Sequence, residues 1–258
     1  MRKKIDMQSY CSSWYKSLSG QSSLDTLDDL CTDILSETFG YYAIEVGLLS
    51  GSHDLLQFSR IAAGFSITNN ECQRFKSASV ISKAEHLPIA TDNVDLVVAS
   101  HVLELSQDPH QVLREIDRVL VPEGHCLLIG FNPFGISQLK RNLTSRISRK
   151  KNPQKMRSVP RVRDWFSLLG FEVLDVHYLG VRPPVKNKKV FDALNWLEKF
   201  GEFAGLMLAN MYVIHVKKQI VAMRPHKKVW RAPAVLSGGK VVLNSTAQKI
   251  RRENYSNL

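Results

Sequence analysis

The sequence has few cysteines, and their arrangement excludes two kinds of site. Four cysteines are spread along 258 residues with no C-x-x-C spacing and no pair of histidines nearby. This arrangement indicates neither a zinc site nor a disulfide framework. We therefore predict reduced, buried thiols that behave as small apolar side chains. They are Cys11, Cys31, Cys72 and Cys126.

Long apolar runs are also missing. A membrane-spanning helix needs about 20 consecutive apolar residues, and the best run, residues 203–214, is interrupted by Gly205 and Asn210. The basic start of the chain leads into Asp6 and not into an apolar stretch, so no secretory signal is evident. These absences predict a cytoplasmic protein with no membrane span.

The net charge of +11 is unevenly distributed along the chain. Residues 138–163 contain ten Lys or Arg and no acid, and residues 217–258 contain ten against the single Glu253. The rest of the chain therefore carries a net charge of −8. Such basic segments can bind nucleic acid, an anionic membrane surface or an anionic substrate, but solvated runs of charge without a partner are also common.

Apolar periodicity predicts an α/β fold in which strands and helices alternate. The predicted elements are helices at 23–39, 53–61, 109–120, 162–169 and 190–203, and strands at 41–46, 94–99, 126–131, 171–179 and 209–216. The helix after Asp108 has the strongest signals, because Asp108 can cap it, Pro109 suits its first position and Gln111 completes a capping box. It joins two apolar strands, so we expect a right-handed crossover in a doubly wound, mostly parallel sheet.

We expect three parts along the chain. Residues 1–40 form a helical lead-in, and residues 41–222 form the α/β domain, which includes the basic segment 138–163 and a helical insertion at about 185–205. Residues 223–258 form a basic, flexible C-terminal tail, because periodicity fades there while Gly, Pro, Ser and basic residues accumulate.

A glycine-containing turn follows the first predicted strand. Ligands of open parallel sheets bind beyond the carboxyl ends of the strands, close to such a turn. Glu45 can accept hydrogen bonds from a ligand amine, and Gly47 and Gly51 allow tight backbone geometry. The alternative is that these glycines only turn the chain into a helix. The turn lacks the G-x-G-x-x-G spacing of a nicotinamide-binding fingerprint.

Four linked motifs follow in a fixed order and spacing. They are AEHLP at residues 84–88, DLVVASHVLE at 95–104, LREI at 113–116 and RVLVPEG at 118–124. Over about residues 42–131 the chain resembles the class I S-adenosylmethionine-dependent methyltransferases of the type 11 group. The resemblance implies a Rossmann-like, seven-stranded sheet whose last strand is antiparallel, and a bacterial subgroup with poorly defined substrates.

The resemblance also implies S-adenosylmethionine as cofactor and assigns residues to it. The family's cofactor loop has an acid followed by three alternating glycines, and Glu45, Gly47 and Gly51 match the acid, the first glycine and the third. Carried over in this way, the cofactor-binding residues are Glu45, Gly47, Gly51, Ala84, Glu85, Ser100 and His101.

Three positions depart from the family pattern. Leu49 replaces the middle glycine, where its side chain would crowd the methionine part of the cofactor, and Lys83 replaces an acid that bonds the adenine amine. Residues 62–68 contain no acid to hold the ribose. These departures keep a second hypothesis open, in which the chain is a non-catalytic adaptor or nucleic-acid-binding module with a methyltransferase fold.

Three polar residues lie where a methyl acceptor is expected. His101 and Glu104 follow the strand at 94–99, and Asn132 follows the strand at 126–131. A base is needed only if the acceptor must lose a proton, and His101 can titrate near neutrality. The alternative is structural, with a histidine packed at a strand end, a glutamate at a helix start and a turn at Asn132. We predict methyl transfer to an unidentified acceptor and no metal.

Overall fold

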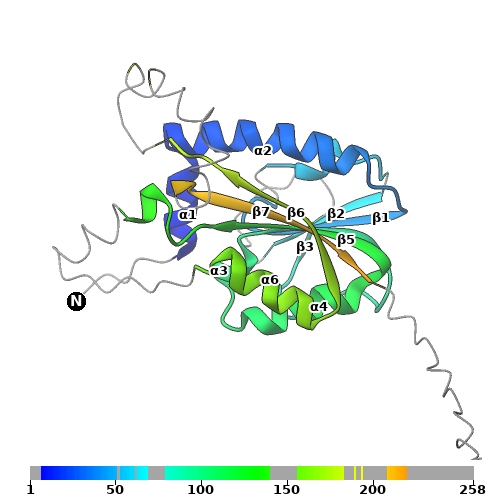
Figure 1. Cartoon of the computed structure of the whole chain (residues 1–258). Coiled ribbons are helices and arrows are strands. Elements are labelled where there is room, and N and C mark those ends of the chain that lie inside the picture. Colours follow the sequence, from blue (N-terminus) through cyan, green and yellow to red (C-terminus); the bar gives the residue numbers. More distant parts are fainter. Residues whose placement is uncertain are drawn as a thin grey trace, which may run out of the picture. The chain divides into compact units, whose positions relative to one another are not determined.

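Seven strands form one sheet in the order β3-β2-β1-β4-β5-β7-β6. The computed structural model describes residues 7–50, 53–61, 63–68, 79–139, 156–182, 189, 193 and 208–219. Strand β7 runs antiparallel to its neighbours β5 and β6, and the other strand pairs are parallel. The predicted Rossmann-like α/β fold with a seven-stranded, mostly parallel sheet is therefore confirmed (Figure 1).

The helices and strands follow the predicted alternation. In chain order they are α1 (Met7–Tyr15), α2 (Leu18–Ser36), β1 (Tyr42–Gly47), the 3-10 helix η1 (Leu55–Phe58), β2 (Ala63–Thr68), β3 (Ser79–Ile81), β4 (Val94–Ser100), α3 (Val102–Leu105), α4 (Pro109–Val119), β5 (Leu120–Phe131), α6 (Val159–Leu168), β6 (Phe171–Leu179) and β7 (Met211–Lys218).

One local expectation is wrong. The helix expected at 53–61 is a single 3-10 turn, η1, and Asp54 makes no side-chain hydrogen bond that would cap a longer helix. Residues 122–124 form an irregular part of β5, where Glu123 has a φ of +66°. The pairing of β4 with β5 is irregular there, because it shifts register between Val94 and Leu96.

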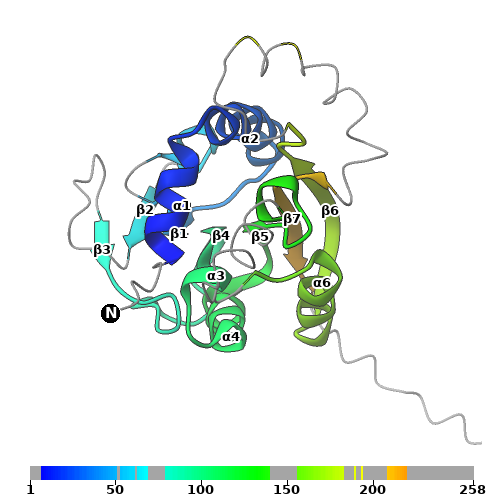
Figure 2. The same ribbon diagram turned by 90° about the vertical axis from the view of Figure 1, so that its left-hand side faces the viewer.

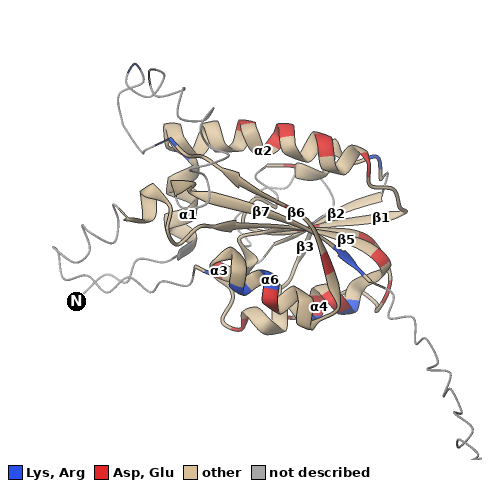
Figure 3. Ribbon diagram, in the orientation of Figure 1, with Lys and Arg blue, Asp and Glu red and all other residues tan. Residues whose placement is uncertain are grey.

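Helices cover the two faces of the sheet in separate layers. Helix α2 lies along one face, while α3, α4 and α6 lie along the other (Figure 1). Ser17 caps α2 by accepting a hydrogen bond from the Gly20 amide, and the buried side of α2 carries Leu27, Cys31 and Leu35. The outward side of α2 is acidic. Its acidic residues are the red segments of the helix at the top of Figure 3. It carries Asp25, Asp28, Asp29 and Asp33.

The short helix α1 lies at one end of the sheet, in front of β1 and beside β4 (Figure 2). Its side chains Cys11, Trp14 and Tyr15 are buried, and they share an apolar cluster with Phe131 at the end of β5. The N-terminal region is therefore more than a lead-in, because it contributes buried side chains to the apolar cluster at the end of β5.

The thiols of Cys11, Cys31 and Cys126 are buried and form no disulfide, as predicted. No helix among the described residues is long and apolar enough to cross a membrane. Several predictions fall outside the described residues. They concern Gly51, Cys72, the helix at 190–203, most of the basic segment 138–163 and the tail at 223–258.

Candidate functional site

The turn after β1 is fixed against the end of β4. Gly47 has a φ of +118°, and a Cβ atom there would lie 2.0 Å from the carbonyl oxygen of Ser100. The next two amides bond to the same residue: Leu48 N–H donates to the Ser100 carbonyl at 2.9 Å, and Leu49 N–H donates to Ser100 Oγ at 3.0 Å. Only glycine satisfies both the dihedral angle and the space.

The side chain of Leu49 does not project from this turn. It is 3% exposed and belongs to the apolar cluster on the α2 side of the sheet, together with Leu48 and Leu55. The expected crowding of a ligand by Leu49 depended on an outward side chain. In this structure the leucine packs into the core instead.

Glu45 is an enclosed carboxyl group two residues before Gly47. It is fully buried, its Oε2 accepts a 3.3 Å hydrogen bond from Leu55 N–H, and its Oε1 is buried with no partner among the described residues. Burial raises the pKa of Glu45 to about 8 against the opposing effect of the Leu55 amide, and the charge of Asp54 contributes to this rise. At neutral pH this carboxyl group is therefore mostly protonated.

His101 is held in an unusual conformation directly after β4. Its φ is +54°, it caps the start of α3, and its side chain is fully buried. The Nε2 atom lies 2.5 Å from the hydroxyl of Tyr15, and the imidazole stacks on Phe131 with ring centroids 4.2 Å apart. Its Nδ1 is buried and has no hydrogen-bond partner in the described part of the protein.

Glu104 faces the same imidazole from α3. Its Oε1 accepts a 2.7 Å hydrogen bond from Phe131 N–H and lies 3.9 Å from His101 Nδ1, while its Oε2 is buried without a hydrogen bond from any described residue. Burial, followed by the nearby Cys11 and the negative charge of Glu104, raises the pKa of Tyr15 well above its ordinary value. Tyr15 is therefore a neutral phenol that can donate to His101.

The side chain of Asn132 stabilises the turn in which it lies. Its Oδ1 accepts a 3.1 Å hydrogen bond from the Phe134 amide, which supports the structural alternative for this residue. Its Nδ2 is buried and makes no hydrogen bond within the described residues. The Nδ2 amino group therefore keeps both of its N–H donors for a ligand.

The other candidates lie around this site in different roles. Ser100 Oγ donates to the Val46 carbonyl as well as accepting from Leu49, so it is a structural link between β4 and the turn. Ala84 packs against the α4-side core, and Glu85 Oε1 accepts a 3.0 Å hydrogen bond from Gln107 N–H. The structure thus brings Glu45, Gly47, Ser100, His101 and Glu104 to the carboxyl ends of β1 and β4.

Sequence reasoning missed the contribution of α1. Tyr10, Trp14 and Tyr15 all lie within 6.3 Å of Phe131, measured between ring centroids. The available signal was the helical spacing of Tyr10, Cys11 and Trp14, which places three apolar side chains on one face of a helix.

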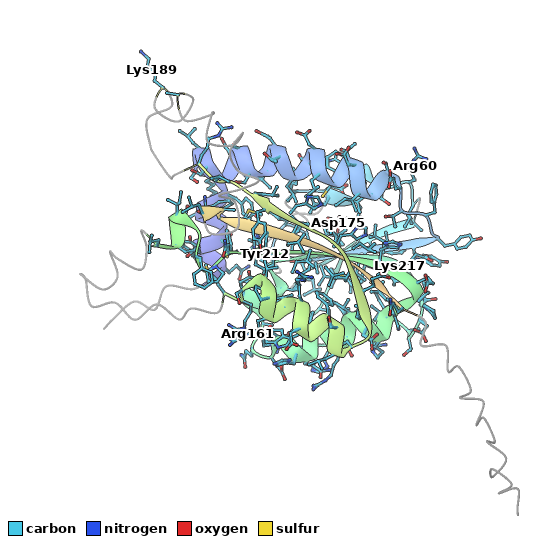
Figure 4. All side chains as sticks on the ribbon, in the orientation of Figure 1. Arg60, Arg161, Asp175, Lys189, Tyr212 and Lys217 are labelled. Atoms are coloured by element: carbon cyan, nitrogen blue, oxygen red, sulfur yellow. The ribbon has the colours of Figure 1, made fainter. Side chains whose placement is uncertain are left out.

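A second polar pair lies toward the opposite end of the sheet. His125 Nδ1 is 2.9 Å from His215 Nε2. Burial, together with the neighbouring His125, lowers the pKa of His215 to about 4. The adjacent Lys217 lies at the end of the sheet away from α1 (Figure 4). This pair is thus separate from the site around His101, and no cluster of metal-binding side chains occurs among the described residues.

Part of the chain matches a known family model and a curated relative. Residues 50–128 match the family model described as a methyltransferase domain. A curated relative, an uncharacterized protein YafS of Escherichia coli strain K12, is 32% identical over 150 residues, which are 57% of this chain. The match covers 60% of the length of that relative.

Solved structures with low sequence identity share the fold. A SAM-dependent methyltransferase from Archaeoglobus fulgidus matches 81% of this chain and 99% of its own, with a TM-score of 0.56 and 16% identity. One from Thermotoga maritima matches 83% of this chain and 96% of its own, with a TM-score of 0.58 and 15% identity. The [4+2]-cyclase SpnF matches 76% of this chain and 81% of its own, with a TM-score of 0.50 and 17% identity. Residues 50–128 thus match a methyltransferase-domain model, and the chain shares its fold with solved structures that are named as SAM-dependent methyltransferases.

Proposed function

We propose that this protein transfers a methyl group from S-adenosylmethionine to an acceptor that binds beside His101. The observation that carries the proposal is the Gly47 turn, which is locked onto Ser100 immediately before His101. A glycine turn at the carboxyl end of the first strand is where this class of fold binds its ligand. The proposal also places the protein in the cytoplasm.

The described residues fit the cofactor. The Oε1 atom of Glu45 is buried and unbonded, so it offers an acceptor for the amine, and Leu49 packs away from the turn. Gly47 supplies a turn in which the backbone can approach a ligand closely. When bound, S-adenosylmethionine supplies a methyl group that is already activated by the positive sulfur.

The protein's own task is then to orient the acceptor and to take its proton. His101 Nε2 is within hydrogen-bond distance of a hydroxyl group, that of Tyr15, and Glu104 lies close enough to Nδ1 to stabilise a protonated imidazole. His101 is therefore the residue to which we assign the proton, and Glu104 is a positioning residue.

Isothermal titration with S-adenosylmethionine and S-adenosylhomocysteine tests the proposal. We expect micromolar dissociation constants, about −8 kcal/mol. Glu45→Gln should weaken binding at least tenfold, because the variant cannot ionise beside the ligand amine. Glu37→Gln, at an exposed position after α2, is the matched control and should leave binding unchanged. Absence of heat and of thermal stabilisation at millimolar ligand would overturn the proposal.

A second candidate function is a non-catalytic adaptor or nucleic-acid-binding module. It is favoured by the closed state of the site, in which Tyr15 already occupies His101 Nε2. The similarity to a [4+2]-cyclase also illustrates that this fold does not determine the reaction. In this alternative the partner is nucleic acid or another anionic molecule, held by the basic segments at 138–163 and 217–258.

A further inference from the structure

Helix α1 closes the site through a small set of side chains. The Tyr15 hydroxyl bonds to His101 Nε2 at 2.5 Å, and the Tyr10 hydroxyl accepts a 2.7 Å hydrogen bond from Gln138 Nε2. Trp14 packs edge-on against Phe131, with ring centroids 5.0 Å apart. The residue that the proposed function needs as a base is therefore covered by a phenol from the chain itself.

We propose that Tyr15 stands in the place of the methyl acceptor, and that the acceptor is a phenol, which replaces Tyr15 when α1 moves away. This inference rests on the proposed function, because it names the class of substrate that binds beside His101. It makes α1 an internal competitor of that substrate.

The surroundings of Tyr15 favour a neutral aromatic hydroxyl compound. The Tyr15 ring lies 5.6 Å from the His101 ring and 6.3 Å from the Phe131 ring, so a second flat ring would meet the same two surfaces. Among the described residues, neither Lys nor Arg forms an ion pair with Glu104 or His101. A carboxylate or phosphate acceptor would therefore lack a cationic partner there and would meet the charge of Glu104.

In this proposal helix α1 moves while the rest of the domain stays folded. It has nine residues, fewer than a helix needs for stability in water on its own, so its side-chain contacts hold it in place. Ser17 caps the start of α2, which remains docked through Leu27, Cys31 and Leu35. The short connection at Lys16 and Ser17 is therefore the natural hinge.

Proton transfer at the site is balanced in this arrangement. The O–H bond of the bound phenol breaks and an N–H bond forms at His101 Nε2, which leaves a phenolate oxygen and an imidazolium ring. Glu104 Oε1, 3.9 Å from His101 Nδ1, compensates the new positive charge. The phenolate is the stronger nucleophile, which is the purpose of removing the proton.

The cysteines provide a test that needs no cofactor. Cys11 lies on α1, Cys31 on the buried side of α2 and Cys126 within β5. All three are fully buried. We would measure the alkylation rate of each thiol by peptide mass spectrometry, with and without millimolar p-cresol. Displacement of α1 by the phenol should accelerate alkylation of Cys11 at least fivefold and leave Cys31 and Cys126 unchanged. The matched probe 4-methylanisole, which lacks the hydroxyl, should have no effect.

Tyr15→Phe keeps the ring and removes the hydroxyl, so the variant tests the bond to His101 without emptying the core. Its Cys11 should react about fivefold faster than in the wild type without any probe, since the buried contacts of the Tyr15 hydroxyl with His101 Nε2 and Met211 Sδ are lost. Two results would overturn the inference: p-cresol and 4-methylanisole acting alike, or Cys11 reacting no faster than Cys126 under every condition. Binding of S-adenosylmethionine together with either result would leave methyl transfer standing and remove the phenol.

Discussion

At the scale of single residues, burial changes the chemistry of Glu45 more than sequence can indicate. The motif places an acid at this position, which suggests a charged anchor. In the structure the carboxyl group is enclosed, and its pKa is raised to about 8, chiefly by burial. The residue is thus neutral until a cation arrives, and binding of an amine should be accompanied by release of a proton.

The raised pKa of Glu45 should also make the stability of the protein depend on pH. Between pH 4.5 and about 8 the folded protein holds a proton on Glu45 that the unfolded chain releases. The contribution of Glu45 to the free energy of unfolding is therefore fully present below pH 4.5. This contribution declines as the pH rises to about 8. The decline is at most a tenfold change in the folding equilibrium per pH unit.

Urea unfolding of the wild type and of Glu45→Gln at pH 5 and pH 8.5 measures this difference. We expect the wild type to lose stability relative to the variant as the pH rises, because the amide of the variant cannot ionise. Parallel pH profiles for the two proteins would show that Glu45 titrates alike in the folded and unfolded chains.

Sequence identified the residues after β4 but not what faces them. His101, Glu104 and Ser100 belong to a local motif, and their neighbours along the chain position them. The partner of His101 is Tyr15, 86 residues earlier. A contact between residues so far apart in the sequence depends on how α1 packs. Neither local propensity nor residue spacing predicts it.

At the scale of elements, local chemistry explains which predictions succeeded. Helix α4 begins at Pro109 as expected, and Asp108 accepts hydrogen bonds from the amides of His110 and Gln111. Its start is encoded within four residues. The helix expected at 53–61 had apolar residues but no cap, and only η1 formed.

The two turns that follow β1 and α6 make a matched pair for mutation. Gly47 and Gly170 both have positive φ, at +118° and +84°. A Cβ atom at Gly47 would lie 2.0 Å from the Ser100 carbonyl oxygen, whereas one at Gly170 meets nothing within 4 Å. Gly47→Ala therefore adds a backbone clash to the strain of a left-handed residue, and Gly170→Ala adds the strain alone.

Thermal or urea unfolding of both variants separates these two costs. We expect Gly170→Ala to lose about 1–2 kcal/mol and Gly47→Ala to lose at least about 3 kcal/mol or to fail to fold. Gly47→Ala should also abolish any binding of S-adenosylmethionine, while Gly170→Ala should retain it. Equal losses of stability would mean that the Gly47 turn can relax away from Ser100.

At the scale of the whole molecule, the fold was predictable because its alternation of apolar strands and helices is carried by the chain itself. Strand β6 coincides with the predicted range of 171–179, and β7 overlaps the prediction at 209–216. The closure of the site was not predictable, since it depends on α1 lying at the end of the sheet (Figure 2), where its side chains contact His101 and Phe131. Net charge is a third property of the whole molecule, and its distribution along the chain comes from the sequence.

The uneven charge gives the last prediction. Changing Arg149, Lys150 and Lys151 to Glu removes three cations from the basic segment at 138–163. If this segment holds nucleic acid, affinity should fall most at low salt, and the slope of log affinity against log salt should flatten by about 2–3, because fewer counterions are released. Fluorescence anisotropy with a labelled single strand at several salt concentrations measures both.

A charge-matched control separates this contact from the net charge of the protein. Arg60, Lys83 and Arg114 are exposed and lie outside the basic segments. Their change to Glu alters the total charge by the same amount and should leave the salt slope nearly unchanged. Equal effects of the two triple variants would indicate attraction by net charge alone, and unchanged affinity in both would remove nucleic acid as a partner. In that case the acidic body and its basic segments would be solvated surfaces, and the site under α1 would be the place to search for function.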